Sequence, residues 1–256
     1  MTKRRDNDSK AASALRLLPK VELHCHLDGS LRPATILELA RERGVRLPAG
    51  TIEGIRPHVQ VHGPCSLGEC LAVFERVYPL LRDAAALERV AYELCEDSAA
   101  DNIRHLEVRY APMLNAAPGF SPEATVEAVL RGLRRGREAF GVSSGVILCL
   151  IRSHGARENG AVMSVLKRYY RSSNGLRTPN VVGMDLAGDE FRFPTRLYSD
   201  FFEQARALGI PPPATPARAP TRRAWRTPSS SGSKGSGTAL VSAPSRGSSP
   251  KSSESA

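Results

Sequence analysis

Strand-like and helix-like segments alternate along the first 210 of the 256 residues of this chain. Short apolar runs predict strands at 21–27, 103–110, 145–151 and 181–186. Longer amphipathic runs predict helices at 33–43, 66–81, 85–100, 122–140, 161–170 and 194–208. This alternation is typical of an α/β fold with a parallel sheet of about four strands. The helices at 66–81 and 85–100 are expected to form a hairpin inserted between the first two strands.

The composition changes abruptly at residue 211. Residues 211–256 are rich in serine, proline, glycine and arginine, and their large apolar side chains are Trp225, Leu240 and Val241. Such a segment cannot bury enough apolar surface to offset the entropy lost on ordering, so we predict a disordered tail. We expect a flexible N-terminus at 1–16 and a folded domain at 17–210.

The net charge of +10 is concentrated in this tail, which has seven basic residues and one acid, Glu254. The tail thus carries +6 and the remainder +4, which is ordinary for an enzyme. This distribution argues against nucleic-acid binding by the folded domain. A basic tail that binds nucleic acid stays open as an alternative.

The chain contains five cysteines, at positions 25, 65, 70, 95 and 149, without the spacing of a metal site or a disulfide framework. We expect free thiols in a reducing cytoplasm. No apolar run approaches the roughly 20 residues that span a membrane, and the basic N-terminus lacks the apolar segment of a secretory signal. We therefore predict a cytoplasmic protein without a membrane partner.

Two histidines, His24 and His26, end the first apolar run. Side chains two residues apart on a strand lie on the same face, so both imidazoles are positioned to bind one metal ion. Ser30 is the expected N-cap of the helix at 33–43. The alternative is a pair of ordinary polar residues at a strand end.

Four segments resemble the adenosine deaminase family, in the family's order. They are LLPKVELHCHLDGSLRP at 17–33, RHLEVRYAP at 104–112, ILCLIR at 147–152 and VGMDLAGDE at 182–190. The resemblance runs from about Leu17 to about Gly209. It implies the N-terminal half, about four strands, of a TIM (β/α)8 barrel.

The resemblance also implies a zinc-dependent enzyme whose metal acidifies a water for attack on C6 of adenine. His24 and His26 match two of the Zn²⁺ ligands. His26, Asp28 and Gly188 match substrate-binding positions, Asp28 accepting a hydrogen bond from the ribose 5′-hydroxyl. The alternative role of Asp28 is a turn residue before the helix, and that of Gly188 is a simple turn glycine.

Four charged residues are predicted to support the site: Glu107, Arg109, Arg152 and Asp185. We interpret them mainly as an ion network near the floor of the pocket. A buried arginine needs a carboxylate, which Glu107, Asp185 or Glu190 can supply.

The resemblance stops where the fifth strand of the family should begin. No histidine follows residue 154, so the third histidine ligand, the catalytic glutamate of T-x-H-A-G-E and the later G-H-G string are missing. The chain therefore contains none of the catalytic residues, and we predict that it is inactive as written.

The tail is compatible with a shifted reading frame. Starting at the third base of the Ala214 codon, codons allowed for 214–220 also encode H-A-G-E-G-P. The same frame permits E-R-I-G-H-G-T over 233–240. We predict a frameshift near residues 210–213, after which the other frame encodes the rest of the enzyme.

The expected function is hydrolytic deamination of adenosine or deoxyadenosine to inosine or deoxyinosine in purine salvage, with a small purine nucleoside as the partner. Related adenine and nucleotide deaminases remain alternatives for the substrate. The other functional alternative is a non-catalytic half-barrel. Half a barrel exposes strand edges and apolar surface, so we expect this chain to fold poorly or aggregate.

Overall fold

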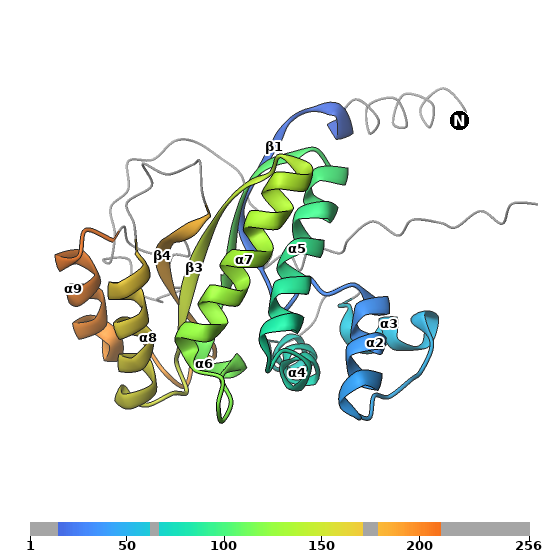
Figure 1. Ribbon diagram of the computed structural model, residues 1–256. Helices are drawn as coiled ribbons and strands as arrows, with labels where there is room; N and C mark the ends of the chain where they lie inside the picture. The colour runs from blue at the N-terminus through green and yellow to red at the C-terminus, as the bar shows by residue number, and fades with distance from the viewer. Residues whose placement is uncertain (1–14, 62–66, 171–178, 211–256) are drawn as a thin grey trace, which may run out of the picture.

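The computed structural model describes residues 15–61, 67–170 and 179–210. Its centre is a parallel sheet in the order β1-β2-β3-β4, each strand pairing with the next along the chain (Figure 1). The strands are β1 (Lys20–His26), β2 (Ile103–Tyr110), β3 (Ser143–Ile151) and β4 (Asn180–Ala187). The predicted α/β fold and the four-stranded part of a barrel are confirmed. The predicted tail at 211–256 and most of the predicted N-terminal segment lie outside the described residues.

Helices and short 3-10 turns connect the strands. They are α2 (Pro33–Arg43), α3 (Ile52–Val59), α4 (Leu67–Val77), η1 (Tyr78–Leu80), α5 (Ala84–Ala100), α6 (Pro112–Asn115), α7 (Pro122–Phe140), α8 (Ala156–Tyr169), η2 (Thr195–Tyr198) and α9 (Ser199–Ala207). Figure 1 shows α5 and α7 side by side against one face of the sheet. In the described part of the chain, no helix is long and apolar enough to cross a membrane.

The sequence did not predict the short helices α3 and α6. Gly54 and Pro57 lie within α3 and disfavour a helix interior, but the Thr51 side chain compensates by accepting the Gly54 N–H at 3.1 Å. α6 is a single turn, too short to show a hydrophobic period. α8 starts at Ala156, five residues before the predicted start. The prediction began too late because Gly160 weakens the helical pattern in the sequence there.

The predicted N-cap at Ser30 is wrong. Arg32 occupies the N-cap of α2 and makes no side-chain capping bond. The Ser30 hydroxyl instead donates to the His26 carbonyl at 2.5 Å and lies 3.2 Å from the Cys25 sulfur. Pro33 supplies the start of α2, because proline suits the first turn of a helix.

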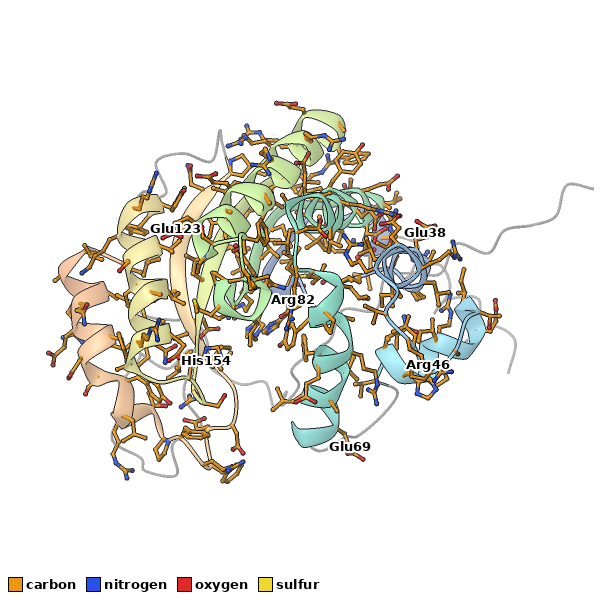
Figure 2. All side chains as sticks on the ribbon, turned by 60° about the horizontal axis from the view of Figure 1, so that its bottom comes forward. Glu38, Arg46, Glu69, Arg82, Glu123 and His154 are labelled. Carbon is orange, nitrogen blue, oxygen red and sulfur yellow. The ribbon has the colours of Figure 1, made fainter. Side chains whose placement is uncertain are left out.

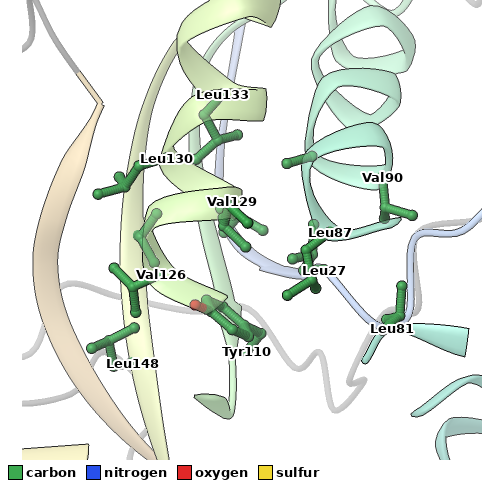
Figure 3. Packing of buried hydrophobic residues seen from close by; sticks show 14 of the residues in the cluster. Leu27, Leu81, Leu87, Val90, Tyr110, Val126, Val129, Leu130, Leu133 and Leu148 are labelled. Carbon is green, nitrogen blue, oxygen red and sulfur yellow. The ribbon is translucent and has the colours of Figure 1, made fainter. Parts of the chain in front are cut away.

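The core lies between the sheet and the layer formed by α5 and α7. Leu106, Val108 and Tyr110 alternate along β2 and are fully buried in this core. Figure 3 shows Tyr110 within the cluster. The two helices approach closely at Gly132, where an added Cβ would lie 2.2 Å from the Glu88 carbonyl oxygen. The opposite face of β2 carries the polar side chains of the predicted ion network.

Three cysteines, Cys25, Cys95 and Cys149, are buried and free, whereas Cys70 is disulfide-bonded. The expectation of five free thiols is therefore corrected. Cys70 lies on α4 and is only partly buried.

Candidate metal and substrate site

His24 and His26 lie together at the carboxyl end of β1. Their ring centroids are 5.5 Å apart, and the two ring planes are inclined by 46°. Burial is the largest cause that lowers the pKa of both imidazoles, to about 4 for His26, and the Arg109 charge adds to it. Both rings are therefore neutral at physiological pH, which is the form that binds metal ions.

The two histidines supply half of a tetrahedral donor set. Within the described residues, no group of three or more His, Cys, Asp or Glu side chains is arranged to hold a metal ion. Structural and catalytic zinc sites use at least three protein ligands. The imidazole pair thus has suitable chemistry for zinc, and further ligands have to come from outside the described part of the chain.

Asp28 is buried two residues after His26. The Tyr78 hydroxyl hydrogen-bonds its carboxyl group, and its Oδ1 lies 3.8 Å from His26 Nδ1. That same Oδ1 is fully buried with no hydrogen-bond partner among the described residues. Burial raises the pKa of Asp28 to about 7, against opposing hydrogen bonds from the backbone and from Tyr78. Asp28 lies in the turn between β1 and α2, the position that its alternative role as a turn residue requires.

An aromatic pair covers this end of β1. The Phe74 ring on α4 lies 5.7 Å from the His26 ring, and it stacks on the Tyr78 ring at 6.5 Å. Neither residue was predicted from the sequence to belong to the site. Their separation of four positions on a predicted helix was the available signal, since such residues share a face.

Gly188 directly follows β4 and has a φ of +107°, in the range that favours glycine. An added Cβ would lie 3.4 Å from the Cβ of Arg152. The backbone N–H of Arg152 donates to the Ala187 carbonyl at 2.8 Å, so a hydrogen bond joins the carboxyl ends of β3 and β4 here. Gly188 is thus a turn glycine that also permits a close backbone approach.

Arg109 and Asp185 form an ion pair on the polar face of the sheet, with both side chains buried. Arg152, also buried, donates to the Phe193 carbonyl at 2.8 Å and lies 3.6 Å from Glu190 Oε1. Arg109 thus pairs with Asp185, and Arg152 lies beside Glu190. These are two of the three carboxylates that the sequence offered as partners for a buried arginine.

Glu107, the third of these carboxylates, lies 4.0 Å from His105 Nε2 on the same strand. His154, in the turn after β3, is labelled in Figure 2, which brings the carboxyl ends of the strands forward. Its Nδ1 is buried without a hydrogen-bond partner among the described residues.

Comparison with known proteins gives one consistent result. The family model described as "Adenosine deaminase" matches residues 19–212. An adenosine deaminase from Clostridium kluyveri is 34% identical over 197 residues, which cover 77% of this chain and 55% of the relative. The chain thus spans about half the length of the curated relatives it matches.

Two solved structures share the fold. An amidohydrolase from Burkholderia ambifaria with bound Zn has a TM-score of 0.65 and 29% identity, covering 77% of this chain and 51% of its own. The adenine deaminase from Arthrobacter aurescens has a TM-score of 0.63 and 25% identity, covering 75% of this chain and 55% of its own.

Proposed function

Because the chain belongs to the adenosine deaminase family, we propose that it supplies the first half of a zinc-dependent site for adenosine. The reaction is the hydrolytic deamination of adenosine or deoxyadenosine to inosine or deoxyinosine, in cytoplasmic purine salvage. The small purine nucleoside is the partner, with no role for a membrane.

The buried Asp28 carboxyl group carries this proposal. A buried oxygen without a hydrogen-bond partner costs free energy, so its retention beside His26 suits a group that receives its partner from a ligand. A hydroxyl group satisfies such an oxygen whether the carboxyl is protonated or ionised. The ribose of a nucleoside offers hydroxyl groups, and a free base does not.

His24 and His26 are proposed as two ligands of the zinc ion. Zinc supplies an acidified water for attack on C6 of the purine. The neutral imidazoles keep their nitrogen lone pairs available at physiological pH. Gly188 is proposed to bring backbone close to the purine ring, because its lack of a Cβ permits that approach.

Glu107, Arg109, Arg152 and Asp185 are proposed as supporting residues. The paired arginines keep the carboxyl ends of the strands in register around the site. None of the four has to touch the substrate for this role.

The chain as written is proposed to be inactive, because two imidazoles do not complete a zinc site and the family's catalytic glutamate is missing. We further propose that 211–256 is the product of a frameshift near residues 210–213. A non-catalytic half-barrel is the second candidate, and the exposed apolar side chains of β1, Val21 and Leu23, favour it. Nucleic-acid binding by the basic tail falls outside the described residues and stays a prediction.

Two polypeptides test the proposal: this chain, and the product of the same gene with the other frame restored after codon 210. With zinc chloride added, the restored polypeptide should convert adenosine to inosine, and this chain should not. In the restored polypeptide, Asp28→Asn should raise the KM for adenosine at least tenfold. Adenine and AMP are the competing substrates.

Greater activity on adenine than on adenosine would overturn the nucleoside assignment. A stop codon soon after codon 210 in the other frame would overturn the frameshift. Inosine formation by this chain alone would contradict the proposed inactivity.

A further inference from the structure

β1 contains a β-bulge that includes His24, the first residue of the histidine pair. The register with β2 shifts between Glu22 and Cys25, so that Leu23 and His24 together face the single residue Glu107. A bulge adds one residue to a strand, leaves its backbone groups without ladder partners and changes the direction of its side chains. One of the two bulged residues here, His24, is a proposed metal ligand.

Side chains bond two backbone groups of the bulged residues. The His24 N–H donates to the Glu22 carboxylate at 2.8 Å. The Leu23 carbonyl oxygen accepts from Nη2 of Arg109, also at 2.8 Å. Neither bond belongs to the regular ladder between β1 and β2, so the bulge depends on these two residues.

The two imidazoles converge at this end of β1. In a regular strand, residues two apart are separated by about 6.6 Å and their side chains run roughly parallel. Here the ring centroids lie 5.5 Å apart and the planes are inclined by 46°. His26 is back in register, opposite Arg109, so the displacement falls on His24.

We propose that Glu22 and Arg109 are positioning residues that hold this bulge and thereby direct the His24 imidazole toward that of His26. The role of Glu22 and Arg109 in holding the bulge stands by itself, and only the relevance of the bulge to metal binding rests on the proposed function. Arg109 suits this task because its fork reaches two acceptors, Asp185 through Nη1 and the Leu23 carbonyl through Nη2. A lysine offers one nitrogen and cannot reproduce this bridge.

The test compares Glu22→Ala, Glu22→Gln and Glu107→Ala in the full chain. Glutamine keeps an oxygen that accepts the His24 N–H, whereas alanine removes it. Glu107 is the matched control, because it faces the bulge from β2 with its carboxylate close to His105. The readout is hydrogen–deuterium exchange at the His24 amide, measured by mass spectrometry with fragmentation at low micromolar concentration.

Glu22→Ala should raise the His24 exchange rate about tenfold, as expected for loss of one charge-assisted hydrogen bond. Glu22→Gln should stay within about twofold of the original chain, and so should Glu107→Ala. Arg109→Lys should also raise exchange at the bulge. If that variant unfolds as a whole, the Glu22 pair still decides the question. An unchanged rate in Glu22→Ala, or an equal increase in Glu107→Ala, would overturn the proposal.

Titration with zinc chloride alone, on the polypeptide with the other frame restored, separates this inference from the proposed function. In that polypeptide, Glu22→Ala should weaken zinc binding at least fivefold, with Glu22→Gln restoring it. If the restored polypeptide without substitutions binds no zinc, the metal part of the proposed function fails. The exchange experiment then still decides whether Glu22 and Arg109 hold the bulge. Zinc binding that is equal in all variants would show that the bulge does not direct His24.

Discussion

Arg109 of β2 and Asp185 of β4 form a buried ion pair that passes over the intervening strand β3. The pair therefore joins strands that are not neighbours in the sheet. Asp185 also accepts the N–H of Leu186 at 2.8 Å, which fixes its carboxylate on β4. This link holds the relative position of β2 and β4 on the face that carries the histidines.

Removing one partner of this pair should be strongly destabilising. Asp185→Leu leaves the Arg109 charge buried without its carboxylate, and we expect the free energy of unfolding to fall by about 3 to 5 kcal/mol. The double variant Arg109→Met with Asp185→Leu removes both charges and should recover most of that loss. Urea unfolding followed by circular dichroism measures both. Additive losses in the double variant would show that the two residues are not energetically coupled.

Asp28 should make the metal-free chain less stable as the pH rises. The pKa of Asp28 rises from its ordinary value of 3.8 to about 7 on folding, so between these pH values the folded state holds a proton that the unfolded state has released. Its favourable contribution is complete below about pH 4 and is lost as the pH rises through 7. Asp28→Asn removes this dependence and should add about 1 to 3 kcal/mol at pH 8, with little change at pH 4.

Urea unfolding at the two pH values, with a chelator present, measures this effect. Asparagine keeps an oxygen for the Tyr78 hydroxyl, so the comparison isolates the charge. Parallel pH profiles for the two proteins would contradict the assignment of the raised pKa to Asp28.

The three free cysteines should be unreactive in the folded chain. Burial raises the pKa of Cys25 to about 11 and that of Cys95 to about 12, and it also raises the pKa of Cys149. Only the thiolate attacks alkylating reagents, so labelling at pH 8 should require unfolding. Because these pKa values are raised on folding, their contribution to stability is lost as the pH rises from about 9. Peptide mapping after iodoacetamide treatment, with and without urea, measures the labelling; modification of Cys95 without urea would contradict the burial.

Apolar side chains at the start of the described chain should promote self-association. Leu17 is 78% exposed, and Val21 and Leu23 on β1 are 61% and 50% exposed. In the sheet formed by the described residues, β1 is an edge strand, and an edge strand presents backbone groups that can pair with another chain. Leu17→Ser with Val21→Thr should reduce dye binding to exposed apolar surface and shift light scattering toward the monomer, with stability changed by less than about 1 kcal/mol.

The matched comparison is Leu106→Ala, which should cost about 2 to 5 kcal/mol because Leu106 is fully buried. If the double surface variant self-associates as strongly as the original chain, the surface responsible for self-association lies elsewhere.

The sequence predicted the strands well because their apolar runs are short and separated by helices. The bounds of β2 agree with the prediction, and so does the spacing that brings His24 and His26 together. Periodicity did not reveal that Tyr78 would meet Asp28, because that contact depends on how a distant helix packs over β1. Long-range packing of this kind leaves no local pattern.

The choice between carboxylates was also beyond the sequence. Glu107 and Asp185 both alternate onto the polar face, but the arrangement of the strands brings Asp185 to Arg109. The bulge at Leu23 and His24 is a second example, since it depends on the register between two strands that lie far apart in the chain. Register is set by the whole sheet, and a single strand does not encode it.

The order of the sheet has a consequence for synthesis. Each strand after the first pairs with the strand that was translated just before it. Every pairing in the sheet can thus form as soon as the later strand leaves the ribosome, without waiting for downstream chain. The assembly of these four strands is in this sense vectorial, and the carboxyl end of β1, with both histidines, belongs to the part of the sheet that forms first.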